Sequence, residues 1–388
     1  MEEKCLVVVL PLEAGQQEDE RLRQVLDAAL EGRKYRKFKS VDALDTWLRE
    51  KEKNIAVPQA EPERGEKCDV SEGGEGENRI LFALSLGELG INLEVTRLIR
   101  YLRSKPESLR GFTGGVIADS RSDLYSKSMA SDLVFAANQA GCAFVGRPLV
   151  EGTKTLSNFA IVAGNMGVDL KEAYEKSAAL LVEEMYRMEF PRHRNPKILV
   201  LHASSHETSN TFAIWREVKK HLSDCSIQEI GLRNGTLADC SGCPYRMCLH
   251  FGEKGSCFYG GVMVEDVYPA IRQADAIVML CPNYNDAISA NLTAFINRLT
   301  ALFRTTRFYE KALFAIVVSG YSGSDIVAKQ LIAALNMNKT FYLPGQFAML
   351  ETANDAGTAM QLPGIEARME AFAGRILSTL QGAEKEVY

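Results

Sequence analysis

The chain has 388 residues, of which 46% are hydrophobic and 24% are charged, which is ordinary for a globular protein with room for two domains. Its formal net charge of −5 gives no reason to expect a nucleic-acid surface. Acidic residues precede a brief apolar run at the N-terminus, and no apolar stretch has the length of a membrane span, so we expect a cytoplasmic protein. The nine cysteines are an odd number, so we expect no disulfide framework.

The first half of the chain alternates short apolar runs with polar connections and helical patterns. We expect strands at Lys4–Leu10, Ile80–Ser85, Gly115–Ser120 and Gly141–Glu151, and a closing helix at Asp169–Met188. Between them, Pro58–Asn78 is rich in Glu and Gly and poor in apolar residues, which predicts a mobile loop.

The second half follows a polar stretch with two prolines, Glu189–Pro196, and alternates in the same way. We expect strands at Lys197–His202, Ser226–Leu232, Ala276–Cys281, Lys311–Ser319 and Thr340–Leu350. We expect helices at Thr211–Leu222, Met263–Gln273, Asn291–Phe303, Ser324–Met337 and Gly364–Leu380. Five strands that each lead into a helix predict an α/β domain, with a parallel sheet covered on both faces.

The two halves match each other element by element. Each expected strand of the first half has a counterpart at a nearly constant offset in the second, and the short connections match in length as well. Any two doubly wound domains share this order of elements, but the matching connections favour an internal duplication. We therefore expect two tandem domains, residues 1–190 and 197–388.

Two loops of the second half carry the strongest chemical signal. After Lys197–His202, the residues Ser204, Ser205, Thr208, Ser209, Asn210 and Thr211 supply hydroxyl and amide groups just before a helix. The N-terminus of a helix attracts anions through its unpaired N–H groups and its dipole, so this loop is typical of a phosphate site. The alternative is an ordinary helix N-cap, for which one such residue would be enough.

These loops resemble a known family. Residues 203–211, Ala-Ser-Ser-His-Glu-Thr-Ser-Asn-Thr, resemble the Gly-Ser-Pro-Arg-x-x-Ser-Asn-Thr loop of NADPH-dependent FMN reductases and iron–sulfur flavoproteins. Residues 281–298 are similar to their Ser-Pro-x-Tyr-x-x-x-x-Ser-x-x-Leu-Lys-x-Phe-Ile-Asp-Arg segment. The family glycine, arginine and lysine are Ala203, His206 and Thr293 here, which weakens charge-based phosphate binding but leaves the hydroxyl donors.

The resemblance implies a flavodoxin-like, three-layer αβα fold for residues 197–388, with FMN as cofactor. It implies phosphate ligands at Ser204, His206, Ser209, Asn210 and Thr211. It implies that the flavin ring is held by Pro282, Asn283, Tyr284 and Asn285, with Ser319, Gly320 and Tyr321 on its far side. The cofactor itself carries the redox reaction, so no catalytic side chain is expected. It also implies a homodimer.

Four cysteines, Cys240, Cys243, Cys248 and Cys257, have the spacing Cys-x2-Cys-x4-Cys-x8-Cys within a Gly-containing loop, 240–257. Four thiolates can hold zinc or an iron–sulfur cluster. The motif resembles that of iron–sulfur flavoproteins, whose spacing is more compact, so a [4Fe–4S] cluster, zinc, a redox pair and plain thiols all stay open. Cys281, beside the expected flavin, is interpreted as a small strand-end residue.

The first half lacks these features. Its counterpart of the phosphate loop, Leu10–Glu20, contains four acidic residues, which would repel a phosphate, and its counterpart of the ring loop, Ser85–Gly90, has no aromatic residue. We expect a degenerate domain that binds no flavin.

Two functions follow from the sequence. The leading one is an FMN-dependent oxidoreductase or electron-transfer flavoprotein, with a small-molecule or protein electron donor and acceptor. Without a Gly-x-Gly-x-x-Gly run, NAD(P)H would have to stack transiently on the flavin, and a cluster would favour ferredoxin as donor. The alternative is a scaffold or regulatory protein, with cysteines that bind zinc or nothing.

Overall fold

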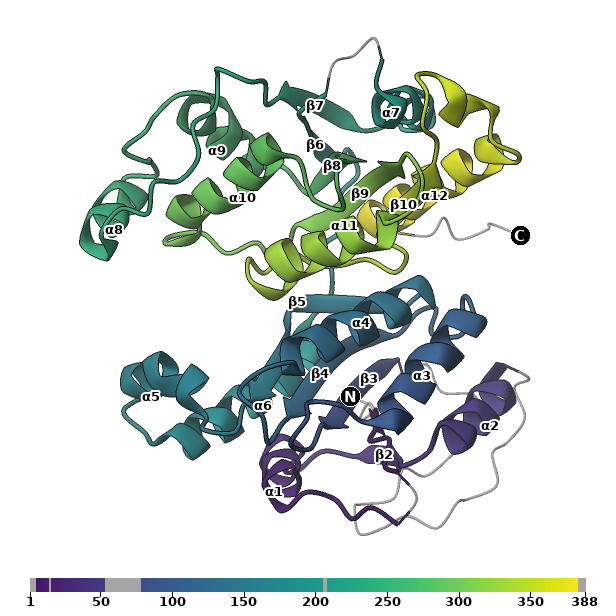
Figure 1. Cartoon of the computed structure of the whole chain (residues 1–388), viewed down its shortest axis with the longest axis vertical. Helices are drawn as coiled ribbons and strands as arrows, with labels where there is room; N and C mark the ends of the chain where they lie inside the picture. Colours follow the sequence, from purple (N-terminus) through teal and green to yellow (C-terminus); the bar gives the residue numbers. More distant parts are fainter. Residues whose placement is uncertain (1–4, 14, 53–77, 205–207, 383–388) are drawn as a thin grey trace. The chain divides into compact units, whose positions relative to one another are not determined.

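The computed structural model describes residues 5–13, 15–52, 78–204 and 208–382. The chain divides into two compact units, Met1–Met188 and Glu189–Tyr388 (Figure 1). Each unit is a five-stranded parallel sheet with helices on both faces. The expected loop Pro58–Asn78 lies, except for Asn78, outside the described residues.

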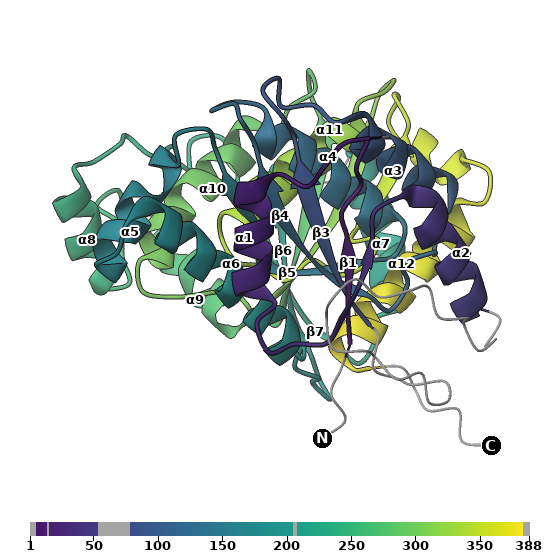
Figure 2. The ribbon, with the colours of Figure 1, turned by 90° about the horizontal axis from the view of Figure 1, so that it is seen from below.

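The first unit orders its strands β2-β1-β3-β4-β5. These strands are β1 (Leu6–Val9), β2 (Tyr35–Phe38), β3 (Arg79–Ser85), β4 (Thr113–Asp119) and β5 (Ala143–Gly152). Its α-helices are α1 (Glu20–Ala29), α2 (Val41–Glu52), α3 (Leu93–Ser104), α4 (Ser126–Gln139), α5 (Ala160–Met166) and α6 (Leu170–Arg187). Helices α1 and α6 pack together, α3 packs with α4, and Figure 2 shows the two pairs on opposite faces of the sheet.

The second unit repeats this order as β7-β6-β8-β9-β10. These strands are β6 (Lys197–His202), β7 (Ser226–Gly231), β8 (Ala276–Asn283), β9 (Ala312–Ser319) and β10 (Ala348–Thr352). Its α-helices are α7 (Asn210–Lys220), α8 (Tyr245–Glu253), α9 (Tyr268–Gln273), α10 (Ala290–Phe303), α11 (Ser324–Leu331) and α12 (Ile365–Leu380). This strand order is that of flavodoxin, so the expected fold is confirmed and the two units are copies of one architecture.

Burial explains why the strands were visible in the sequence. All eight residues of β9 and the first six of β8 are buried, as continuous apolar runs in a sheet covered on both faces must be. On one face, Trp215 and Phe372 anchor the core that α7 and α12 build against the sheet. Within the described parts of the chain, no helix is long and apolar enough to cross a membrane.

The structure corrects some expected boundaries. The last strand was expected over Thr340–Leu350, but β10 covers only Ala348–Thr352. Pro344 has no backbone N–H to give to a sheet, and Thr340 and Gln346 have left-handed backbones with φ of 66° and 52°, so the chain before β10 cannot be a continuous strand. The expected helices Met263–Gln273 and Ser324–Met337 form, each with a π-helical segment, at Met263–Val267 and Ile332–Met337.

Candidate functional site

Three loops leave the second sheet at one edge, the carboxyl ends of β6, β8 and β9. β8 pairs with β6 on one side and with β9 on the other, and residue Asn283 at the end of β8 lies opposite Ser319 at the end of β9. The strand order reverses between β6 and β8, and in open parallel sheets ligands bind in the crevice at such a reversal. The two sequence motifs are thus brought to one place.

The loop after β6 ends in a capped helix. Helix α7 begins at Asn210, and the Ser209 side chain caps it by accepting a hydrogen bond from the Phe212 N–H at 3.3 Å. The Oγ of Ser209 also lies 2.8 Å from Oγ1 of Thr211, which is buried. The other N–H groups of this first turn and the helix dipole favour an anion there. His206 lies outside the described residues.

Ser204 and Asn210, also of this loop, differ in how many of their side-chain hydrogen bonds are already made within the protein. The Oγ of Ser204 is buried and has no hydrogen-bond partner among the residues described. The amide of Asn210, in contrast, donates to the carbonyls of Ala353 and Asp355 at 3.2 and 2.8 Å and accepts from the N–H of Gly357 at 2.9 Å. Asn210 therefore holds the 353–359 loop beside the candidate phosphate site, whereas the Ser204 hydroxyl bonds to no other described residue.

The loop after β8 is a tight turn. Tyr284 and Ala287 form an isolated antiparallel bridge, and the Ala287 N–H donates to the Tyr284 carbonyl at 3.3 Å. Asn285 and Asp286 between them both have φ of 55°, which is the pattern of a type I′ turn and suits Asn and Asp. Tyr284 is 59% exposed, so the turn leaves an aromatic side chain open for stacking.

Asn283 joins this turn to the loop after β9. Its Nδ2 lies 3.2 Å from Oδ1 of Asp286, 3.0 Å from Oγ of Ser319 and 3.0 Å from the carbonyl of Ser322. Its Oδ1 is buried without a partner among the described residues. Gly323 has φ of +86°, and a Cβ there would clash with Oδ1 of Asp286, so the two loops touch closely.

The remaining expected site residues lie on the same edge. Pro282 is half-buried within β8, opposite Val318, and Gly320 packs against Asn354. Tyr321 is 84% exposed. The structure thus places the described residues of the predicted flavin site on these three loops or on the strand and helix ends that flank them. Polar atoms of Ser204 and Asn283 have no partner among the residues that the structure describes.

The four clustered cysteines form a second feature of this unit. All four line one cavity of about 180 Å³, together with residues of α8, α10 and the following turn. The other lining residues are Gly242, Met247, Phe251, Phe258, Tyr259, Asn297, Arg298, Thr300, Ala301 and Arg304. Helix α8 was not expected from the sequence, and it carries Cys248 in the middle of the cysteine segment.

Arg298 of α10 clamps both ends of the cysteine segment. Its side chain is 2% exposed and donates to the carbonyls of Ala238 and Gly260, at 3.3 and 2.7 Å. Among the described residues, however, no group of three or more His, Cys, Asp and Glu side chains is arranged to hold a metal ion. The cavity therefore gathers four free thiols without a ready coordination geometry.

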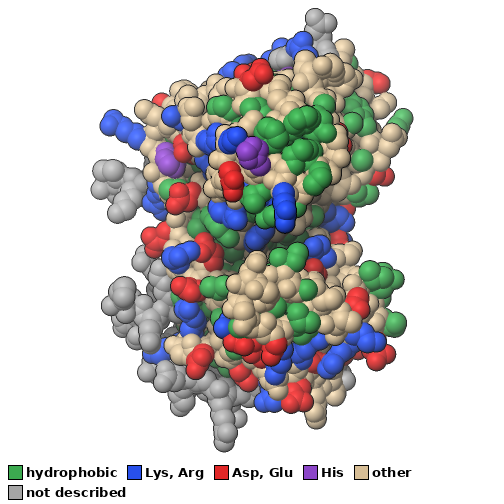
Figure 3. Space-filling model, turned by 90° about the vertical axis from the view of Figure 1, so that its left-hand side faces the viewer, with side chains coloured by type: hydrophobic (Ala, Val, Ile, Leu, Met, Phe, Trp, Pro, Cys, Tyr) green, Lys and Arg blue, Asp and Glu red, His purple; other side chains and the backbone are tan. Residues whose placement is uncertain are grey.

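Exposed aromatic residues lie beside charged ones on the surface around α8. On the face seen in Figure 3, hydrophobic side chains gather over the second unit. Tyr245 and Phe258 of the cysteine segment are 61% and 58% exposed.

Cys281, near the end of β8, is fully buried, and burial raises the pKa of its thiol to about 12, which agrees with a packing role for this residue.

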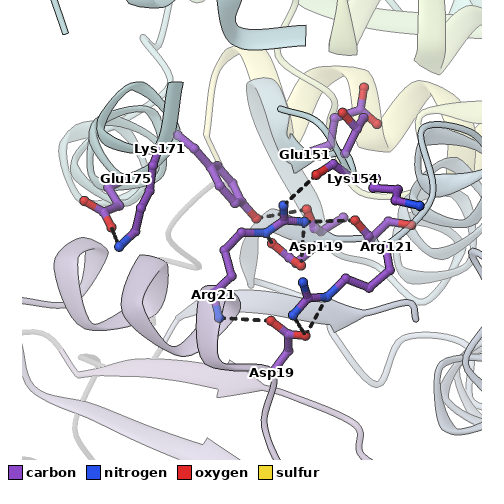
Figure 4. Close-up of polar contacts among 12 residues, drawn as sticks. Asp19, Arg21, Asp119, Arg121, Glu151, Lys154, Lys171 and Glu175 are labelled. Atoms are coloured by element: carbon purple, nitrogen blue, oxygen red, sulfur yellow. Dashed lines mark hydrogen bonds and ion pairs between the residues drawn. The ribbon is translucent and has the colours of Figure 1, made fainter. Parts of the chain in front are cut away.

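The first unit fills the corresponding edge with its own charges (Figure 4). The guanidinium of Arg21, on α1, donates to both carboxylate oxygens of the buried Asp119, at 2.8 and 3.0 Å. Asp19 caps α1 by accepting from the Arg21 N–H at 2.9 Å, and Arg121 pairs with it at 2.7 Å. Burial opposes ionisation of Asp19, but these hydrogen bonds prevail and lower its pKa. The N-terminus of α1 thus carries a carboxylate of the chain itself.

Comparison with known proteins adds to this geometry. The family model for NADPH-dependent FMN reductase matches residues 196–355, from the start of β6 to the loop after β10. A search of curated protein sequences gave no match.

Three solved structures are among those that are similar to part of this chain. RosB with bound 8-demethyl-8-formylriboflavin-5′-phosphate is 12% identical over 50% of this chain and 82% of that chain, with a TM-score of 0.38. A putative quinone reductase from Klebsiella pneumoniae is 16% identical over 48% and 86%, with a TM-score of 0.33. An NAD(P)H:quinone oxidoreductase from Methanothermobacter marburgensis is 14% identical over 48% and 96%, with a TM-score of 0.34.

The family match falls on the unit that carries the phosphate-type loop and the ring-type turn, and it confirms the resemblance seen in those two motifs. FMN is the cofactor that the match implies. Residues 196–355, in the second of two flavodoxin-like units, match the NADPH-dependent FMN reductase family.

Proposed function

We propose that the protein is an FMN-dependent oxidoreductase whose cofactor lies on the carboxyl edge of the second sheet. The observation that carries the proposal is the convergence of three loops at the reversal between β6 and β8. These loops bear polar atoms of Ser204 and Asn283 that have no partner within the described part of the chain, and the exposed aromatic ring of Tyr284. The family match of residues 196–355 supports the same cofactor.

In this proposal the N-terminus of α7, which begins at Asn210, holds the FMN phosphate, with Ser204, His206, Ser209, Asn210 and Thr211 as its ligands. Tyr284 stacks against the ring, and Asn283 presents to a polar edge of it the Oδ1 that bonds to no other described residue. The other proposed ring contacts are Pro282, Asn285, Ser319, Gly320 and Tyr321. Bound FMN supplies the redox chemistry, the uptake of a hydride or of electrons and their delivery to an acceptor.

The proposed electron donor is NAD(P)H, since the matched family is NADPH-dependent. The exposed Tyr284 and Tyr321 border an open side of the site, where a nicotinamide ring could approach the flavin. We also propose a homodimer, as the family resemblance implies. We propose that the first unit binds no flavin, because Asp19 places a negative charge at the N-terminus of α1.

The cysteine cavity is proposed as a second cofactor site, for a [4Fe–4S] cluster. Four thiols around one space supply the ligand number that such a cluster needs, although the described side chains would have to move to reach a coordination geometry. With a cluster bound, ferredoxin would become a candidate donor. No step of the proposed flavin reaction depends on this cavity.

Purification without air, followed by absorption spectroscopy and NAD(P)H oxidation with quinone and azo acceptors, tests these proposals. A flavin spectrum, or one gained on adding FMN, together with acceptor-dependent oxidation supports the first. A protein that is colourless once FMN has been added and the unbound FMN removed would refute it and favour a scaffold or regulatory role. Iron, sulfide and zinc analysis of the wild type and of Cys243→Ser decides between a cluster, zinc and uncoordinated thiols.

A further inference from the structure

We propose that Gln330, on α11, is a positioning residue for the flavin ring. It lies outside both sequence motifs, yet its side chain holds the turn that carries Tyr284. The inference rests on the proposed FMN site and adds to it a residue that controls how the ring is held.

The contacts of Gln330 are two hydrogen bonds to one turn. Its Oε1 accepts from the Ile288 N–H at 3.0 Å, and its Nε2 donates to the Asp286 carbonyl at 3.0 Å. A primary amide is the side chain that offers a donor and an acceptor side by side, so Gln330 satisfies a backbone N–H and a backbone C=O of the turn at once. The Asp286 carbonyl belongs to the residue directly after Asn285, and the Ile288 N–H lies two residues further along the chain.

The turn needs such support because its conformation is unusual. Asn285 and Asp286 are both left-handed without being glycine, and the bridging hydrogen bond from Ala287 to Tyr284 is long, at 3.3 Å. Left-handed residues are less stable than right-handed ones, even for Asn and Asp. The turn therefore depends on contacts from outside it.

Those contacts come from one neighbouring segment. Asn283, at the start of the turn, binds Ser319 and the carbonyl of Ser322 in the loop after β9, and Gln330 in the helix that follows binds the far end of the turn. The turn is thus fixed at both ends by the β9–α11 segment. The direction of the Tyr284 ring and of the turn's backbone groups, and with it the environment of a bound flavin, follows from these contacts.

Three variants test the inference. Gln330→Ala removes both hydrogen bonds, and Gln330→Glu keeps an acceptor for Ile288 but sets a carboxylate oxygen against the Asp286 carbonyl. At pH 8 we expect both to raise the Kd for FMN about tenfold to thirtyfold. The matched control, Asp325→Ala, removes an exposed side chain of the same helix that pairs with Lys329, and should change the Kd by less than about twofold.

The Glu variant adds a pH readout. Protonation gives the carboxyl an O–H donor and so restores the pattern of the amide. The ratio of its Kd to that of the wild type, measured at the same pH, should fall at least about threefold between pH 8 and pH 5. Asp286, Asp325 and Lys329 are the charged groups next to residue 330 on α11 and on the turn, and both proteins contain them, so the wild type at each pH is the reference.

Spectra and potentials separate positioning from simple stability. At saturating FMN, the absorption band and the midpoint potential of the flavin should differ between Gln330→Ala and the wild type and be unchanged in Asp325→Ala. Should Gln330→Ala bind FMN within about twofold of the wild type, or lower only the Tm, the inference is wrong. Should the wild type bind no FMN, the proposed function fails first. If Gln330→Ala does not fold, the pH-dependent ratio of Gln330→Glu decides, and a flat ratio overturns the inference.

Discussion

The substitution Ser204→Ala should change stability and cofactor binding in opposite ways. The Oγ of Ser204 is buried and has no partner among the described residues. A buried hydroxyl without a partner costs about 1–3 kcal/mol, so its removal should stabilise the protein without FMN by about 1 kcal/mol. The change removes one oxygen and no carbon, so no apolar contact is lost.

The same substitution should weaken the binding of FMN. A hydrogen bond from Ser204 to a phosphate oxygen would contribute about 1.5–3 kcal/mol, as bonds to charged groups do. Its loss should raise the Kd for FMN about tenfold to more than a hundredfold. Urea unfolding of the protein without FMN and fluorescence titration with FMN measure the two effects separately.

Ser209→Ala is the matched control on the same loop. The Ser209 hydroxyl caps α7, so its removal should cost about 1 kcal/mol of stability without FMN and should also weaken FMN binding. Both substitutions are thus expected to weaken FMN binding. Without FMN, however, Ser204→Ala should stabilise the protein and Ser209→Ala should destabilise it. If Ser204→Ala destabilises the free protein, or leaves the Kd unchanged, the assignment of its hydroxyl to the phosphate is wrong.

Three further outcomes are expected. Gly323→Ala should lower the free energy of unfolding by about 1–2 kcal/mol in a urea titration and weaken FMN binding, since its Cβ would press on Asp286; an unchanged Kd would show that the two loops are independent. Arg21→Met should destabilise the first unit by about 3–5 kcal/mol, because it leaves the buried Asp119 without its ion-pair partner. The loss should appear as faster amide hydrogen exchange confined to that unit, and it should shrink as falling pH protonates Asp119. Unaltered exchange would contradict this prediction. In native protein at pH 8, iodoacetamide followed by mass spectrometry should modify the exposed Cys240 and spare Cys281, whose pKa is raised to about 12; early modification of Cys281 would show that its strand end opens.

Most of the second sheet could be predicted from the sequence because parallel, doubly covered strands are continuous apolar runs. β6 was predicted with its observed bounds, and β8 begins where it was expected. β10 was not, because the apolar residues before it sit in an irregular segment around Pro344. α8 was missed because its sequence, with Cys248, His250 and Gly252, has neither a strong propensity nor a clear stop signal.

The candidate site was predictable only where its residues are contiguous. The loops at Ser204–Thr211 and Pro282–Asn285 could be read from local composition and from resemblance. The roles of individual side chains depend on partners far along the chain, as when Asn210 binds Asp355 and Gln330 binds Asp286. No local pattern contains such pairings, since they arise only when the parallel strands bring distant loops to one edge.

The two units differ in the residue that caps the helix after their first strand. Both start a helix, α1 or α7, at the carboxyl edge of the first strand, where free N–H groups and the helix dipole favour negative charge. In the first unit the chain provides that charge through Asp19 and balances it with Arg121. In the second the cap is the neutral Ser209, and the nearby Ser204 hydroxyl has no partner among the described residues. The helix N-terminus is therefore capped by a carboxylate in the first unit and by a neutral hydroxyl in the second, where we propose that the FMN phosphate binds. This difference in residues, rather than any difference in architecture, assigns the proposed cofactor to the second unit.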